Sequence, residues 1–327
     1  MKKTFLLLLI TIFCFPLVAL EIWSPEVAAN LKPESIKKDE KIIRSAIKFI
    51  KKNDFSDSKI RGYLEKNGSK IQPQNRGFGL QKYSGVFSDG YVRFAFDYIS
   101  YENEPCKLTF YIKDVDWKLV ENHLDKKVVK DFLRVFRKKE TNYSFEPVFI
   151  YSAEFEFPDN YARFSEHKRA LVGSLHELSI PKEYQKYYDF LFSAETESAY
   201  GYSGGVAPQK TDGRCAMEKL LELKDKRVFI NILKGDNPCG RIYAAEGLLR
   251  LENSTENVKI INDIFAPLIS EGITYKTIDG CIIFELKYPF YEYDAKLAFP
   301  EIKQFIPPVY NEDWKELEFE LDWDKIE

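Results

Sequence analysis

The spacing of apolar residues predicts a helix at the start of the folded region. Between residues 33 and 53, apolar side chains recur at steps of three and four among lysines, which is the period of an amphipathic helix. A shorter helix is predicted over residues 57–65. Residues 32–70 carry twelve basic and six acidic side chains. This excess indicates either a solvated helix face or a surface attracted to anionic groups such as lipid headgroups.

The next segment alternates apolar and polar residues with the period of two that is typical of strands. Asp89-Gly90 lies between two runs rich in aromatic residues, and this dipeptide favours a tight hairpin turn. A third strand is predicted over residues 106–112 and another over residues 148–157. We predict a three-stranded antiparallel meander that the later strand completes. Residues 117–139 have a helical period and are predicted as one long helix that covers a face of the sheet.

The pattern after residue 159 is mainly helical. Asn237-Pro238 marks a helix start, because asparagine caps helices and proline is tolerated in their first turn. Asp279-Gly280 predicts a second hairpin that caps the helices. Helices are predicted at residues 166–178, 182–193, 212–223, 226–233, 238–251 and 255–269.

These elements predict an α+β protein in two parts. Residues 31–159 are expected to form an antiparallel sheet covered by helices. Residues 164–309 are expected to form a mainly helical domain of α-solenoid-like helix pairs with a terminal β-hairpin. Two such pairs fall below the roughly three repeats that a free-standing array needs, so they must pack on something else.

The last segment, residues 310–327, is an acidic aromatic tail with eight acids and two lysines. One interpretation is an edge strand packed on its own domain. The other is an extended segment offered to a partner. The residues that would contact such a partner are Trp314, Phe319 and Trp323.

The first twenty residues have the layout of a secretory signal peptide. Lys2 and Lys3 precede an apolar run that ends in smaller residues. The run over residues 5–20 is shorter than the roughly 20 residues that a membrane-spanning helix needs. We expect a secreted or periplasmic protein, cleaved near residues 19–20, with no transmembrane helix in the mature chain.

Net charge and cysteine content limit the partners, disulfides and metal sites that we expect. The formal net charge of −3 becomes more negative once the two lysines of the leader are removed, which gives no basis for binding nucleic acid. Four cysteines then remain, and an even number in an oxidising compartment favours disulfides, although four buried free thiols are the alternative. If the helices starting at residues 212 and 238 run parallel, Cys215 and Cys239 come to the same end, and we predict a bridge between them. No C-x-x-C pair suggests a metal site.

The sequence GYSGG at residues 201–205 fits the G-x-S-x-G elbow of hydrolases. All three histidines precede Ser203, whereas the α/β-hydrolase order is serine, acid, histidine. The eighty residues from His123 to Ser203 include helical segments, which does not fit a chymotrypsin arrangement. We interpret Gly201, Gly204 and Gly205 as a structural connection into the next helix.

No catalytic, cofactor-binding or metal-binding residue is predicted. His167 and His176 are nine residues apart, which places them on opposite sides of one helix. Neither H-E-x-x-H nor a P-loop sequence occurs. Paired carboxylates for acid and base catalysis cannot be chosen among 51 acids without geometry.

The stretches GYSGGVAP, NPCGRIYAAEGLLRL and DGCIIF resemble the C-terminal part of a family of uncharacterised secreted bacterial proteins. The resemblance covers residues 199–284. It implies export and a helical-repeat-like fold, and it offers no activity. It also implies structural roles for the glycines, with Tyr243 and Ala244 packed between helices.

Three functions are compatible with these observations. We favour a non-catalytic binding or interaction protein of the bacterial envelope, whose ligand or protein partner the sequence does not identify. The second is a peripheral protein that associates with a membrane surface through its basic N-terminal helix. The third is a hydrolase that uses Ser203.

Overall fold

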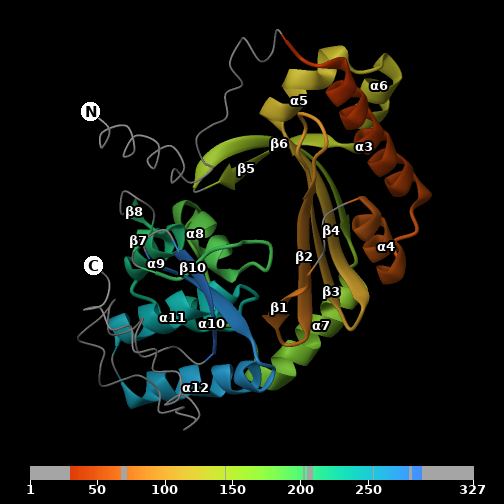
Figure 1. Cartoon of the computed structure of the whole chain (residues 1–327). Coiled ribbons are helices and arrows are strands. Elements are labelled where there is room, and N and C mark those ends of the chain that lie inside the picture. The colour runs from red at the N-terminus through yellow and green to blue at the C-terminus, as the bar shows by residue number, and fades with distance from the viewer. Residues whose placement is uncertain are drawn as a thin grey trace, which may run out of the picture.

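The computed structural model describes residues 30–67, 72–143, 145–201, 203–204, 209–252, 254–279 and 282–288. It contains an antiparallel six-stranded sheet and a mostly helical C-terminal half (Figure 1). The predicted α+β fold class is therefore confirmed. Several predictions lie outside the described residues, namely those on residues 1–20, Gly205, Cys281, Trp314, Phe319 and Trp323.

The six-stranded sheet has the order β1-β2-β3-β4-β6-β5, and all neighbours are antiparallel. The predicted meander is present as β2-β3-β4, and the strand predicted over residues 148–157 lies beside β4. Two edge strands, β1 and β5, were not predicted. The strands are β1 Gln74–Gly77, β2 Leu80–Phe87, β3 Phe94–Tyr101, β4 Glu104–Lys113, β5 Arg137–Tyr143 and β6 Glu146–Glu156.

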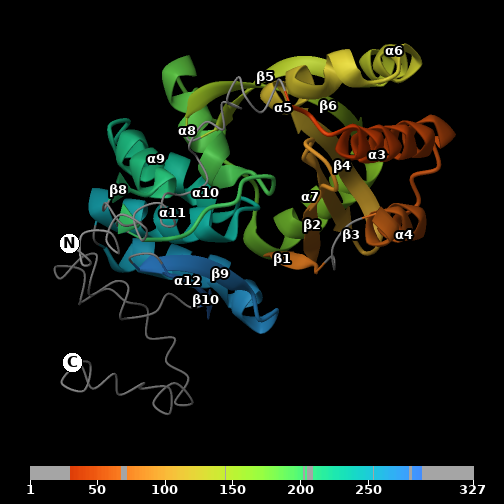
Figure 2. The same cartoon turned by 45° about the horizontal axis from the view of Figure 1, so that its top comes forward.

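Helices cover one face of this sheet (Figure 2). Alternate side chains of β3, at Phe94, Phe96 and Tyr98, are buried against the isoleucines of the amphipathic first helix. The alternation that predicted the strand thus identifies the face that packs on the helices. The covering helices are α3 Pro33–Lys52, α4 Asp57–Asn67, α5 Asp114–Val120 and α6 Lys126–Val135.

The single long helix predicted over residues 117–139 is wrong. The chain there forms α5, a 3₁₀ turn, α6 and then strand β5. Asp125 interrupts the helix, because its carboxylate accepts hydrogen bonds from the backbone N–H groups of Lys127 and Val128 and so caps a new one. After α6, residues 137–143 pair with β6, which satisfies their backbone groups in a strand. That pairing depends on a segment later in the chain.

The hairpin at Asp89-Gly90 is present, but its turn is not tight. Residues 88–93 join β2 to β3. The carboxylate of Asp39, on α3, accepts hydrogen bonds from the backbone N–H groups of Tyr91 and Val92 at 3.0 and 3.1 Å. Gly90 lies directly against the same carboxylate. A side chain from a distant helix therefore replaces the two-residue turn.

The helices of the C-terminal half surround α11, which is buried along nearly its whole length. The predicted starts at residues 212, 226 and 238 agree with the structure, and the second hairpin is present. The elements are α7 Pro158–Val172, α8 Lys182–Phe192, β7 Ser203–Gly204, β8 Gln209–Lys210, α9 Asp212–Leu221, α10 Lys226–Leu233, α11 Pro238–Leu251, α12 Thr255–Ser270, β9 Thr274–Asp279 and β10 Ile282–Lys287.

The two halves share a hydrophobic cluster. The second face of the sheet contributes Leu80, Ile99 and Tyr101 to the cluster that contains α11, and α7 packs on β3 and β4. Polar contacts also cross the junction. The guanidinium of Arg241, on α11, donates to the backbone carbonyl of Arg76 at 2.6 Å. The helical half therefore covers one end of the sheet face that α3 to α6 leave open.

The predicted bridge between Cys215 and Cys239 is not formed, and all cysteines in the described part of the chain are free thiols. The buried sulfur of Cys239 lies 2.9 and 3.3 Å from the carbonyl oxygens of Ser198 and Lys276. The first turn of α9 instead packs on Tyr243, about one turn further along α11. The starts of α9 and α11 are therefore offset by about one turn, whereas the prediction placed them at the same end.

Within the described ranges, none of the helices combines the length and the apolar character needed to cross a bilayer.

Candidate functional site

The first residue of the GYSGG segment, Gly201, is anchored on the helices. The N–H of Gly201 donates to the hydroxyl of Tyr243 at 3.0 Å, and the hydroxyl of Thr211 donates to the carbonyl of Gly201 at 3.0 Å. A β-carbon at Gly201 would lie 2.8 Å from Ile278, so this position has room only for glycine. Ser203 lies in β7, which pairs with Lys210 of β8.

His167 and His176 do not lie on one helix as predicted, because α7 ends at Val172, before His176. The ring of His167 lies 5.7 Å from the ring of Tyr101, and the backbone of His176 forms two hydrogen bonds with the side chain of Asn231. Over the residues that the structure describes, no three His, Cys, Asp or Glu side chains are arranged to hold a metal ion.

A buried carboxylate, Glu246 on α11, holds the helical half together. It is fully buried and pairs with Arg214 of α9, which is also fully buried. Its oxygens also accept from the hydroxyl of Tyr200 at 2.9 Å and from Nε of Arg250 at 2.9 Å. Burial raises the pKa of Glu246, while the two arginines oppose that effect. This cluster ties the segment before GYSGG to α9 and α11.

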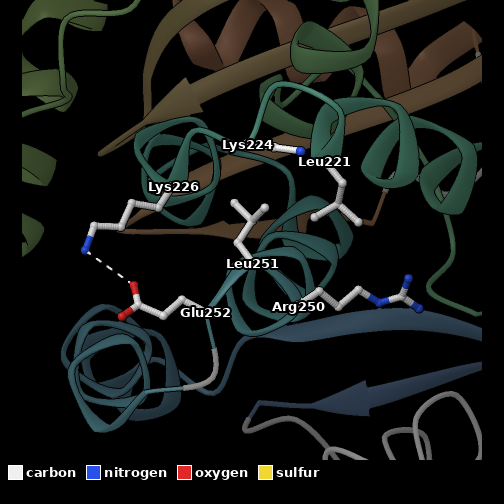
Figure 3. Close-up of a pocket in the computed structure, with 6 residues that line it drawn as sticks. All are labelled: Leu221, Lys224, Lys226, Arg250, Leu251 and Glu252. Carbon is white, nitrogen blue, oxygen red and sulfur yellow. Dashed lines mark ion pairs between the residues drawn. The ribbon is translucent and has the colours of Figure 1, made fainter.

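A surface depression of about 670 Å³ lies at the ends of α9 and α11 (Figure 3). Its charged groups are partly neutralised by one another. Nζ of Lys226 lies 3.8 Å from Glu252, and Arg250 is held by the buried Glu246. The depression therefore offers little charge that is not already paired. Its lining consists of Leu221, Lys224, Lys226, Arg250, Leu251 and Glu252.

A second group of charges lies where the sheet meets the helical half. We call it the junction cluster. Nζ of Lys82 lies 3.2 Å from Asp97 and 3.7 Å from Glu197, and it donates to the backbone carbonyl of Glu195 at 2.6 Å. Nη2 of Arg76 lies 3.8 Å from the same Glu197 oxygen. The members of the junction cluster are Arg76, Lys82, Asp97, Glu197 and Lys276.

Burial changes the acidity of these groups. Only 1% of Lys82 and 6% of Arg76 are exposed, and burial lowers the pKa of both cations. Burial alone would raise the pKa of Glu197, but the positive charges of Lys82, Lys276 and Arg76 together lower it. Perturbed ionisable groups at a junction between two structural units mark a candidate site.

The junction cluster was not predicted from the sequence. Lys82 and Asp97 occupy the alternate positions of β2 and β3 that face away from the helix-covered side. In a strand with one covered face, such polar positions are expected to meet solvent. The helical half covers part of this face, so the same pattern places charges in the interior. No motif or spacing in the sequence indicates this.

A third feature is the outer surface of α3 and α6. The two helices lie side by side (Figure 2), and Lys51 of α3 forms an ion pair with Asp131 of α6 at 3.1 Å. Two acids of this surface have a basic partner within it: Glu40 binds Arg44 at 2.6 Å, and Asp125 lies 3.6 Å from the same arginine.

Many lysines on this surface have no acidic partner among the described residues. Eight exposed lysines of α3 and α6 form no ion pair with any described residue, and we call them the basic face. On α3, four of these lysines recur at helical spacing on the side opposite the buried isoleucines, namely Lys37, Lys41, Lys48 and Lys52. The basic face consists of Lys37, Lys38, Lys41, Lys48, Lys52, Lys126, Lys127 and Lys130.

Comparison with known proteins identifies no relative: no protein-family model, curated protein or solved structure matches the chain. The resemblance to secreted bacterial proteins therefore still depends on the short motifs within residues 199–284.

Proposed function

We propose that the protein is an exported, non-catalytic interaction protein that associates with the anionic lipid surface of the bacterial envelope through its basic face. The observation that supports this proposal is the surplus of exposed lysines that α3 and α6 share. The chain as a whole has a formal net charge of −3, so the positive charge is local to this surface. Such asymmetry favours an anionic surface as the partner.

The expected attraction between the basic face and an anionic membrane is large enough to support binding. Each lysine or arginine near an anionic bilayer contributes about 1 kcal/mol, and the contribution falls off within a Debye length of about 10 Å. The four lysines of α3 that lie opposite its buried isoleucines all face the same direction, so several of them can approach a membrane together.

The structure also bears on the mode of association. The apolar residues of α3, including Ile43 and Ile47, are buried on the sheet. They cannot enter the acyl region of a bilayer while the protein remains folded, unlike those of an inserted amphipathic helix. We therefore expect electrostatic and salt-reversible association.

Replacing Lys37, Lys41 and Lys48 with glutamine is expected to weaken binding to vesicles roughly 100-fold at low salt, because three attractions of about 1 kcal/mol each are lost. Co-sedimentation with vesicles of phosphatidylglycerol and phosphatidylcholine measures this effect. Vesicles of phosphatidylcholine alone should not bind.

The matched control changes three exposed lysines elsewhere, Lys182, Lys224 and Lys287, to glutamine. It alters the net charge equally but should change vesicle binding less than about twofold. Equal weakening by both triple variants would contradict the proposal, and so would an unsubstituted chain that ignores anionic vesicles. Binding to DNA or to an acidic polypeptide without binding to vesicles would also exclude lipid as the partner.

A separate triple variant tests whether α6 belongs to the same surface. Replacing Lys126, Lys127 and Lys130 with glutamine should weaken vesicle binding about as much as the α3 variant, again roughly 100-fold. The two helices are more than seventy residues apart in sequence, so this effect is expected only from their proximity in the fold. Unchanged binding would limit the membrane-facing surface to α3.

A further inference from the structure

Arg76 is nearly fully buried in the junction cluster, yet one edge of its guanidinium lacks hydrogen bonds. Only 6% of the residue is exposed, and Nε and Nη2 have no hydrogen-bond partner among the described residues. These two nitrogens form the side-on edge of the guanidinium, whose parallel N–H groups match the two oxygens of a carboxylate. A buried donor pair of this kind is costly unless an acceptor satisfies it.

The cations around this edge outnumber the carboxylates, and the buried guanidinium of Arg241 adds a further positive charge beside Arg76. The junction cluster contains three cations and two carboxylates, Asp97 and Glu197. Glu197 is shared among all three cations, since its oxygens lie 3.8 Å from Arg76, 3.7 Å from Lys82 and 3.4 Å from Lys276. A bound carboxylate would offset part of this positive charge.

Solvent reaches the outer part of the junction cluster. The side chains of Glu197 and Lys276 are 40% and 42% exposed, so both lie at the rim while Arg76 and Lys82 lie behind them. A small ligand that enters past Glu197 would therefore meet the guanidinium edge of Arg76.

We propose that the junction cluster is a binding site for a small monocarboxylate, with the carboxylate seated on Nε and Nη2 of Arg76 and Glu197 displaced towards Lys276. This site is separate from the basic face and does not depend on the association with lipid.

Acetate is the probe, titrated into the full mature chain at constant ionic strength and followed by NMR at the Nε–H group of Arg76. Saturable binding is expected for acetate, and its absence would overturn the proposal. Arg76→Lys keeps the positive charge but lacks the side-on edge, so it should weaken acetate binding at least tenfold. This is roughly the effect of losing one charge-assisted hydrogen bond. Because the variant has no Nε–H group of arginine at this position, its binding is followed at the methyl signal of acetate. The matched control Arg163→Lys changes an exposed arginine of α7 and should leave binding unchanged.

A second variant separates a binding site from a structural contact. Glu197→Gln removes the carboxylate that competes for Arg76, so acetate should bind severalfold more tightly than to the unsubstituted chain. Unchanged or weaker binding would show that Glu197 does not compete for the edge and would overturn the proposal.

A crystal structure of the unsubstituted chain with acetate decides the matter even if Arg76→Lys fails to fold. The proposal expects both acetate oxygens on Nε and Nη2 of Arg76. It is overturned if Glu197 occupies that edge in the presence of acetate.

Discussion

Replacing Gly240 with alanine is expected to destabilise the protein by about 3 kcal/mol or more. Gly240 lies in the first turn of α11, and a β-carbon there would sit 1.8 Å from the backbone carbonyl oxygen of Leu191 on α8. A backbone oxygen within a helix cannot rotate away, so α8 and α11 would have to separate. Overpacking of this kind costs about 1–3 kcal/mol or more, which exceeds the gain in helix propensity from glycine to alanine.

The matched control is Gly62→Ala in α4. No atom lies within 4 Å of the position that its β-carbon would take. Alanine should therefore stabilise the protein by about 0.5–1 kcal/mol. Urea denaturation followed by circular dichroism measures both free energies of unfolding. If the two variants changed stability in the same direction, the close approach of α8 to α11 would be wrong.

Replacing Glu246 with glutamine is expected to lower the free energy of unfolding by about 3–5 kcal/mol. Glu246 and Arg214 are both fully buried, so the substitution leaves a buried guanidinium without its carboxylate. The hydroxyl of Tyr200 and the side chain of Arg250 lose the same charged acceptor. Thermal and urea unfolding would both report the loss.

The exposed pair of Lys219 and Glu222, 2.7 Å apart on the surface of α9, is the matched control. Glu222→Gln should leave the free energy of unfolding nearly unchanged, because solvent screens such pairs. A double variant, Arg214→Met with Glu246→Gln, should be more stable than Glu246→Gln alone, since it removes the unpaired charge. A double variant as unstable as the two single changes combined would show that packing, not charge, explains the loss.

The sequence alone was sufficient where the determinants are local. The period of the isoleucines predicted α3, because a helix with one apolar side is stabilised by burying that side. Asn237-Pro238 located the start of α11, and the asparagine side chain caps that helix in the structure. Alternation predicted β2, β3 and β4 in their correct order. In each case, the information lies within a few residues.

The sequence was insufficient where a distant segment competes with a local pattern. Residues 137–139 fall within the long helix predicted from periodicity, yet they begin a strand, because β6 satisfies their backbone groups. Asp39 reshapes the turn at Asp89-Gly90 from another helix. The start of α9 is offset along α11, which separates Cys215 from Cys239. Neither the partners nor the offset can be derived from local periodicity.

The basic face and the junction cluster also differ in how far the sequence alone predicts them. The lysines of α3 were visible in the sequence as a basic helix, but only the fold adds those of α6 beside them. The junction cluster was invisible, because its members come from separate strands and a loop and are five among many charged residues. Local sequence determined which side of each helix or strand is apolar. Only the tertiary structure decided which polar positions are covered, because burial of a charge depends on the segment that packs over it.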